Sequence, residues 1–283
     1  MYMFERIEDF KKNHEYLVCI DSDGCAMDTM DIKHFECFGP CMIEEWGLEK
    51  WDKKLLERWN EINLYTKTRG TNRFKTLGMI LKEVNASYVK IEGLETLEEW
   101  ISHTKELSNS NLQNKIEETN SEILKKTLRW SLNVNKKIEK IKAEDKKAFA
   151  GVKECLDYLN HNADLVVVSS ANFQAVREEW ENENLLQYMS LILTQNDGSK
   201  AFCIEQLLAK GYKAENVLML GDSPGDLQAA SVNKVLFYPI LVKKEEESWE
   251  YLKNIIADKL FQGMYAGNCE NEMILKFKEN LHI

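Results

Sequence analysis

The chain has 283 residues, of which 44% are hydrophobic and 30% are charged. This composition is ordinary for a folded globular protein, and the length allows one or two domains. A surplus of acidic residues gives a net charge of −10, which disfavours general binding to nucleic acids or to acidic membranes. The sequence contains no apolar stretch of the length that a bilayer requires, so we expect no membrane-spanning segment.

Two further features predict a cytoplasmic protein. Residues 1–16 are charged, show a helical pattern and lack the apolar core of a signal peptide. The seven cysteines are odd in number and include no Cys-x-x-Cys pair, which indicates buried, reduced thiols.

The first predicted strand is the short apolar segment at residues 16–20, and two carboxylates follow it, Asp21 and Asp23. In an open α/β sheet the carboxyl ends of the strands border the ligand crevice. Because the chain turns just past Asp21, both carboxylates can face one pocket. Two close carboxylates repel each other unless a cation joins them. The pair therefore predicts a nucleophile beside an acid or base, held by a divalent metal.

Residues 29–146 show apolar side chains at helical spacing, for example Leu124, Leu128 and Leu132, and no strand pattern. A segment of this length cannot be a loop. We expect a helical domain inserted directly after the first strand.

Strands and helices alternate after residue 150, which is typical of a parallel sheet with helices on both faces. The predicted strands are Leu165–Val168, Leu191–Thr194, Val217–Leu220 and Val235–Tyr238. The predicted helices are Gly151–Asn160, Phe173–Glu183 and Ser199–Lys210.

The predicted class is α/β, with a three-layer Rossmann-like parallel-sheet core formed by residues 1–28 and 147–242. The inserted, all-helical cap domain spans 29–146. A helical extension at 243–283 carries an apolar stripe that suits the core or a partner: Trp249, Leu252, Ile256 and Leu260.

Polar groups follow a second predicted strand at Ser169 and Ser170. A hydroxyl there, with the N–H groups of the next helix start, can bind an oxyanion or phosphate, although serines also serve as simple helix caps. Lys200 opens a helix, where the helix dipole disfavours a cation, so it is a candidate for facing an anion. Taken alone, it could equally be one of many surface lysines.

The segment 221–226, Gly-Asp-Ser-Pro-Gly-Asp, follows a third buried strand. Its tight turn lets Asp222 and Asp226 converge on a hard cation through oxygen ligands. A capped helix start with acidic residues in its first turn is the alternative. The strand-end position favours the first reading, because it presents the carboxylates to the same crevice as Asp21.

In this order, the motifs DxDG, a strand-end serine, a lysine and GDxxxD resemble the haloacid dehalogenase superfamily of aspartate-nucleophile hydrolases. The resemblance covers about 16–30 and 148–238. The helical segment lies where phosphatase-type members, similar to phosphoglycolate phosphatase and β-phosphoglucomutase, carry a helical C1 cap. The chain departs from the usual pattern at Cys25, where Thr or Val is more frequent, and at Ala201, where many capped members have proline.

The resemblance implies a phosphatase that acts on a small phosphorylated metabolite. Asp21 would be the nucleophile that forms an aspartyl-phosphate, and Asp23 would protonate the leaving oxygen and then activate water. Lys200 and one of the two serines, Ser169 or Ser170, would bind the phosphoryl oxygens.

The resemblance also implies Mg²⁺ as the cofactor. Its ligands would be Asp21, the backbone carbonyl of Asp23 and Asp222, with Asp226 bound to the ion or supporting it. A phosphomutase of the same superfamily is the alternative, as is a non-catalytic protein that binds a phosphometabolite. Dehalogenases and phosphonate-cleaving relatives lack the second aspartate, so Asp23 disfavours both.

The cap contains a basic segment at residues 65–77, in a chain that is acidic as a whole. Arg69 or Arg73 could bind a second anionic group of the substrate. The alternative is a solvated basic turn.

Overall fold

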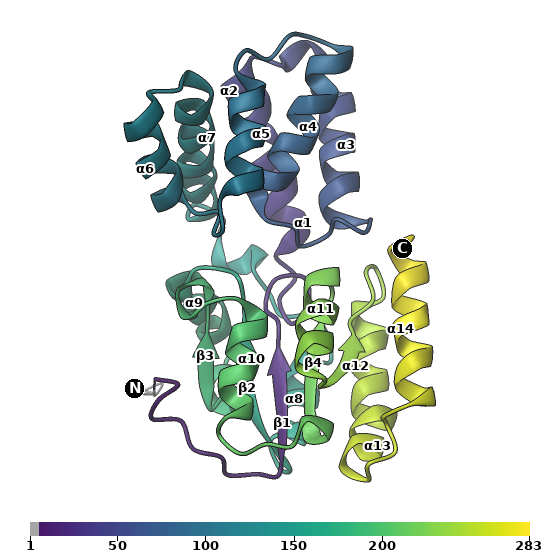
Figure 1. Ribbon diagram of the computed structural model, residues 1–283. Coiled ribbons are helices and arrows are strands. Elements are labelled where there is room, and N and C mark those ends of the chain that lie inside the picture. Colours follow the sequence, from purple (N-terminus) through teal and green to yellow (C-terminus); the bar gives the residue numbers. More distant parts are fainter. Residues whose placement is uncertain (1–5) are drawn as a thin grey trace. The chain divides into compact units, whose positions relative to one another are not determined.

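The computed structural model describes residues 6–283, which divide into two compact units (Figure 1). The core unit combines the residues up to Met30 with 142–283, and the cap unit comprises 31–141. Residues 1–5 of the predicted core lie outside the described residues.

The core unit contains a sheet of five parallel strands in the order β3-β2-β1-β4-β5. Strand β1 lies at the centre, with Ile20 opposite Val167 on β2 and Leu220 on β4. Because a central parallel strand is covered on both faces, its sequence is continuously apolar. The predicted α/β class is confirmed, and the strands are β1 Tyr16–Ile20, β2 Ala163–Val168, β3 Leu191–Leu193, β4 Val217–Gly221 and β5 Leu236–Pro239.

Four helices connect these strands: α8 Val152–Leu159, α9 Phe173–Asn182, α10 Lys200–Leu208 and α11 Pro224–Asn233. Right-handed crossovers with this strand order put α8 and α9 on one face and α10 and α11 on the other, in front of the sheet in Figure 1. The order reverses between β1 and β4. The carboxyl ends of these two strands therefore border the crevice where open α/β sheets bind ligands.

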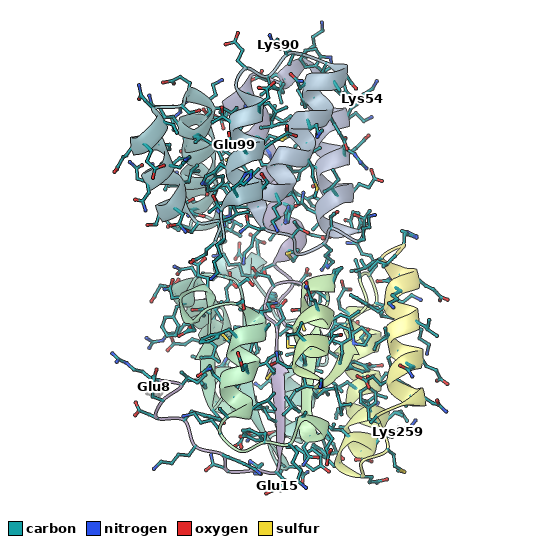
Figure 2. The ribbon with its side chains drawn as sticks, viewed as in Figure 1. Glu8, Glu15, Lys54, Lys90, Glu99 and Lys259 are labelled. Atoms are coloured by element: carbon teal, nitrogen blue, oxygen red, sulfur yellow. The ribbon has the colours of Figure 1, made fainter. Side chains whose placement is uncertain are left out.

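The cap unit is helical throughout residues 31–141, all of which are described, and no strand interrupts it. Its helices bury an apolar core of their own, in which Trp59, Phe74 and Trp130 pack edge to face. The side chains of Lys54 and Glu99 are exposed on its outer surface (Figure 2). The elements are α1 Met30–Ile32, a π-helix at Lys33–Phe38, α2 Gly39–Trp46, α3 Asp52–Leu64, α4 Arg73–Ser87, α5 Leu94–His103, α6 Asn109–Thr119 and α7 Glu122–Ile138.

The C-terminal segment after β5 packs on the core unit. It forms α12 Glu245–Tyr251, a π-helix at Leu252–Ile256, α13 Ala257–Phe261 and α14 Asn268–Asn280. Helix α12 contacts α8, and α14 contacts β5. The predicted apolar stripe is at most 1% exposed and belongs to the same apolar cluster as the strands.

The helix expected over residues 1–16 is wrong for the described part, because residues 6–14 form turns and irregular chain. Its own backbone hydrogen bonds form one turn, from Asp9 and Phe10 to the carbonyl of Arg6, and the residues before β1 are held by bonds to the core. Asp164, at the start of β2, accepts the backbone N–H groups of Asn13 and His14, both at 2.9 Å, and the hydroxyl of Tyr212. These contacts fix the chain just before it enters β1.

All seven cysteines lie within the described residues and are free thiols, six of them buried. Across residues 6–283 no helix combines the length and the apolar character that crossing a membrane requires.

The Asp164 carboxylate makes stability depend on pH. Burial opposes its ionisation, but the hydrogen bonds from Tyr212, His14 and Asn13 outweigh burial and lower the pKa of Asp164. A lowered native pKa stabilises the fold above the unfolded value, about 3.9, and this contribution disappears as the pH falls through the native pKa. We expect Asp164→Asn to reduce the free energy of unfolding by about 2 kcal/mol at pH 7 and by less at pH ~3, which lies below the unfolded pKa.

Urea denaturation of both proteins at the two pH values measures this difference. Asp258→Asn is the matched control, because Asp258 pairs with Tyr158 in an exposed position. It should cost less than about 0.5 kcal/mol at either pH. An equal effect of Asp164→Asn at both pH values would contradict the prediction.

Candidate active site

The loop after β1 (residues 21–27, the β1 loop) is a compact turn that places Asp21 beside β4. The N–H of Asp21 donates to the carbonyl of Leu220 at 3.0 Å, continuing the sheet by one residue. Gly24 has φ of 78°, which allows the chain to reverse there. The N–H groups of Ala26 and Met27 then donate to the carbonyl of Ser22. Asp21 is buried as a result, and 8% of its side chain is exposed.

Asp23 lies in the same loop and is half-buried. Its Oδ1 accepts a hydrogen bond of 2.6 Å from the hydroxyl of Thr29, which is itself fully buried. The sequence reading gave Thr29 no role. A hydroxyl six residues after the second aspartate carries no pattern that would single it out.

The ammonium of Lys200 lies between two carboxylates. Its Nζ is 2.8 Å from Oδ1 of Asp21 and 2.6 Å from Oδ1 of Asp226. Ser199 caps α10, so Lys200 occupies the first helical residue, where the helix dipole disfavours its charge. Burial lowers the pKa of Lys200, but the charges of Asp21 and Asp226 outweigh it and raise the pKa above its ordinary value. Lys200 is therefore a fixed cation at neutral pH.

Asp226 is held by the start of α11. Its Oδ2 accepts the N–H of Ser223 at 3.1 Å and the Ser223 hydroxyl at 2.7 Å, which completes a capping box. The sequence pattern Ser-x-x-Asp signals such a box. The alternative of a capped helix start is therefore present, with Ser223 as the cap, and Asp226 also lies beside Asp21 and Asp222. With its two oxygens engaged by Ser223 and Lys200, Asp226 is better placed to support a cation site than to bind the ion.

Three carboxylates converge at the ends of β1 and β4. Asp21, Asp222 and Asp226 each present an oxygen, and these oxygens lie within 4.8 Å of one another. Burial raises the pKa of Asp21, the Lys200 ammonium opposes this, and the charges of Asp226 and Asp222 add to the rise, which leaves the pKa well above its ordinary value. When all three carboxylates are ionised, the cluster with Lys200 carries a net charge of about −2. Carboxylate oxygens are hard donors, which suit Mg²⁺. The residues present therefore fit a divalent cation.

The two serines differ in their surroundings. Ser169 is 4% exposed, its N–H donates to Leu193 on β3, and its hydroxyl accepts the N–H of Ala171 at 3.1 Å. Ser170 is exposed. Neither serine caps α9, because Asn172 fills that position and accepts the N–H of Gln174. The helix-cap alternative is therefore wrong for both serines.

The two cap arginines are held by cap residues. Arg69 is 3% exposed and donates to the carbonyl of Leu64 at 2.8 Å, so it does not lie in a solvated turn. Arg73 donates to Asn135 at 2.7 Å, and its guanidinium lies 5.0 Å from the centre of the Phe38 ring.

Gly221 is sterically required at the end of β4. A Cβ at this position would lie 2.3 Å from Cβ of Asp226, closer than real Cβ atoms come to their neighbours. We expect Gly221→Ala to displace Asp226, break its bond to Lys200 and lower the free energy of unfolding by at least about 2 kcal/mol. Gly225→Ala is the control, because its Cβ would meet only the Ser223 hydroxyl at 3.5 Å. Thermal unfolding of the two variants compares them, and equal melting temperatures would contradict the prediction.

Comparison with solved structures gave several similar proteins. A haloacid dehalogenase-like family hydrolase from Streptococcus pneumoniae is 12% identical, with a TM-score of 0.50 over 83% of this chain and 90% of that one. A proposed β-phosphoglucomutase from Thermotoga maritima is 16% identical, with a TM-score of 0.49 over 85% and 99%. A proposed phosphoglycolate phosphatase from Lactobacillus plantarum is 11% identical, with a TM-score of 0.47 over 84% and 91%.

The search of curated proteins gave no match. The family model for haloacid dehalogenase-like hydrolases matches residues 76–238, more than half of the chain. With the strand order and the motifs described above, this match identifies the chain as a member of the haloacid dehalogenase-like hydrolase family.

Proposed function

We propose that the protein is a Mg²⁺-dependent phosphomonoesterase that acts on a small phosphorylated metabolite through an aspartyl-phosphate. One observation carries the proposal: the buried carboxylate of Asp21 is held at 2.8 Å by Lys200, with Asp222 and Asp226 beside it at the point where the strand order reverses. A carboxylate oriented by a fixed cation and facing a cation site suits phosphoryl transfer, which depends on positioning and charge neutralisation.

Asp21 attacks the phosphorus, and the bond from phosphorus to the ester oxygen breaks. The protonated carboxyl of Asp23 gives its proton to the leaving oxygen, which departs as an alcohol. A water molecule then attacks the phosphorus of the aspartyl-phosphate, and the Asp23 carboxylate takes a proton from it. Phosphate leaves, and Asp21 returns to its free carboxylate. Lys200 and the buried Ser169 bind the phosphoryl oxygens; exposed Ser170 is the alternative to Ser169.

The acidic cluster supports the metal assignment. Asp21, the backbone carbonyl of Asp23 and Asp222 would hold Mg²⁺, and Asp226 would support the site through its bonds to Lys200 and Ser223. When bound, the ion neutralises charge on the phosphoryl oxygens. A cytoplasmic location, without nucleic-acid or membrane partners, stays a prediction, which the free thiols and the net charge of −10 support.

Phosphate release from p-nitrophenyl phosphate and from a panel of sugar phosphates, phospho-acids and nucleotides tests the proposal. We expect release with Mg²⁺ and none with EDTA. Asp21→Asn should lower kcat at least about a thousandfold, because it removes the nucleophile. Asp157→Asn, which changes an exposed carboxylate on α8, should leave kcat unchanged.

Two outcomes contradict this proposal. Equal phosphate release by the wild type and by Asp21→Asn would remove Asp21 as the nucleophile. Absence of release from every substrate, by a folded protein that binds Mg²⁺, would favour the phosphomutase or the non-catalytic binding protein.

The second anionic group of the substrate is assigned to the cap arginines as a separate proposal. Arg69→Ala or Arg73→Ala should raise KM about tenfold for a doubly anionic substrate and leave KM for p-nitrophenyl phosphate unchanged. Arg58→Ala is the control, because Arg58 binds Glu61 and Glu83 on the cap surface. Unchanged KM values with a lowered melting temperature would assign both arginines to cap stability alone.

A further inference from the structure

The β1 loop carries both aspartates of the proposed reaction, so its conformation determines where they lie. Three N–H groups inside the loop donate to the carbonyl of Ser22, and the N–H of Gly24 donates to that of Met27. Outside the loop, Lys200 pairs with Asp21, and the N–H of Phe149 donates to the carbonyl of Ala26. Two buried indoles, those of Trp180 and Trp249, add bonds from α9 and α12.

Trp180 lies on α9 and is fully buried. Its Nε1–H donates to the hydroxyl of Ser22 at 2.9 Å. Ser22 stands between Asp21 and Asp23, so this bond fixes the loop from one side at the residue that joins the two carboxylates.

Trp249 lies on α12, in the segment after the last strand, and is also fully buried. Its Nε1–H donates to the carbonyl of Cys25 at 2.9 Å, across 224 positions of sequence. The same residue packs against Gly151, where a Cβ would lie 3.4 Å from Cβ of Trp249. Gly151 precedes α8 with φ of 84°, so Trp249 contacts the β1 loop and the chain that returns from the cap unit.

We propose that Trp180 and Trp249 (the tryptophan pair) are positioning residues that hold the β1 loop in its reactive conformation. An indole N–H is a donor only, so each bond has one direction and one acceptor. The two acceptors, the Ser22 hydroxyl and the Cys25 carbonyl, belong to buried residues. A buried acceptor without a donor destabilises the fold, because no hydrogen bond compensates for its removal from water. Both indole bonds therefore favour the present conformation of the loop over alternatives in which these acceptors lack a donor. Trp249 lies outside the matched family segment, which ends at residue 238.

The inference rests on the proposed function, because positioning has a catalytic effect only if Asp21 and Asp23 react. Displacing reacting groups by a fraction of an ångström lowers kcat more than KM, since orientation matters most in the transition state. Loss of either indole donor should therefore lower kcat and leave KM nearly unchanged.

The test uses Trp180→Phe and Trp249→Phe, which keep an aromatic ring and remove the donor. We expect hydrogen exchange of the backbone amides at 21–27 to become about tenfold faster in both variants. We also expect kcat for p-nitrophenyl phosphate to fall about tenfold, with KM within twofold of the wild type. Ser22→Ala removes the acceptor of Trp180 and leaves the ring in the core, so it replaces Trp180→Phe if that variant does not fold.

Tyr265→Phe is the matched control. Tyr265 is fully buried, follows α13 and donates its hydroxyl to the carbonyl of Phe237 on β5. The variant loses a buried bond of the same kind, so its melting temperature should fall, while exchange at 21–27 and kcat should not change.

Hydrogen exchange and enzyme activity together distinguish failure of the positioning role from failure of the proposed function. Unchanged exchange at 21–27 in the tryptophan variants overturns the positioning role, and so does faster exchange with unchanged kcat. If the wild type releases no phosphate, the proposed function fails, and faster exchange confined to 21–27 still supports attachment of the loop by the tryptophan pair.

Discussion

Three carboxylates share the carboxyl ends of β1 and β4 with the ammonium of Lys200, and the rest of the core unit serves to keep these four charges together. Removing one member of such a cluster leaves uncompensated charge in a buried place, which typically costs 3–5 kcal/mol. The surrounding structure meets this cost with apolar packing of the sheet and with fixed neighbours: Gly221 leaves room for Asp226, and Ser223 holds it. Without a bound cation, only this packing and these fixed neighbours hold the cluster together.

Different elements of the core unit position the different charged residues of the cluster. The sheet fixes Asp21 and Asp222 through register, and the helix starts fix Lys200 and Asp226 through caps. Lys200 and Asp226 thus lie at helix starts, and Asp21 continues β1 by one residue through its N–H bond to Leu220. Asp23 lies farther along the β1 loop, to which two buried indoles donate hydrogen bonds. Parts of the chain that bear no reactive group, α9 and α12, therefore take part in the site's geometry.

Local sequence patterns predicted the elements well because the strands are short apolar runs and the helices have one apolar face. All five strands occur where they were expected, to within two residues at either end. The helix expected before Tyr16 failed, because tertiary contacts with Asp164 override a weak local pattern. Because parallel strands end at one edge of the sheet, the positions after the strands and at the helix starts predicted that four residues lie close together: Asp21, Lys200, Asp222 and Asp226. The contacts of Trp180 and Trp249 with the β1 loop were not predicted, because a contact across more than a hundred residues leaves no local signal. Thr29 lies only six residues from Asp23, but a single hydroxyl at that spacing forms no recognisable pattern.

The strand order also constrains how the chain folds during synthesis. Strand β1 is made early, but its two neighbours begin only at Ala163 and Val217. The cap residues, with an apolar core of their own, emerge from the ribosome before either neighbour exists. Folding of the cap unit therefore precedes pairing of β1, and such distant pairing is intrinsically slow. A ribosome-bound chain stalled before β4 would lack one neighbour of β1 and both Asp222 and Asp226, so the charge cluster is complete only after β4 and the start of α11 have been translated.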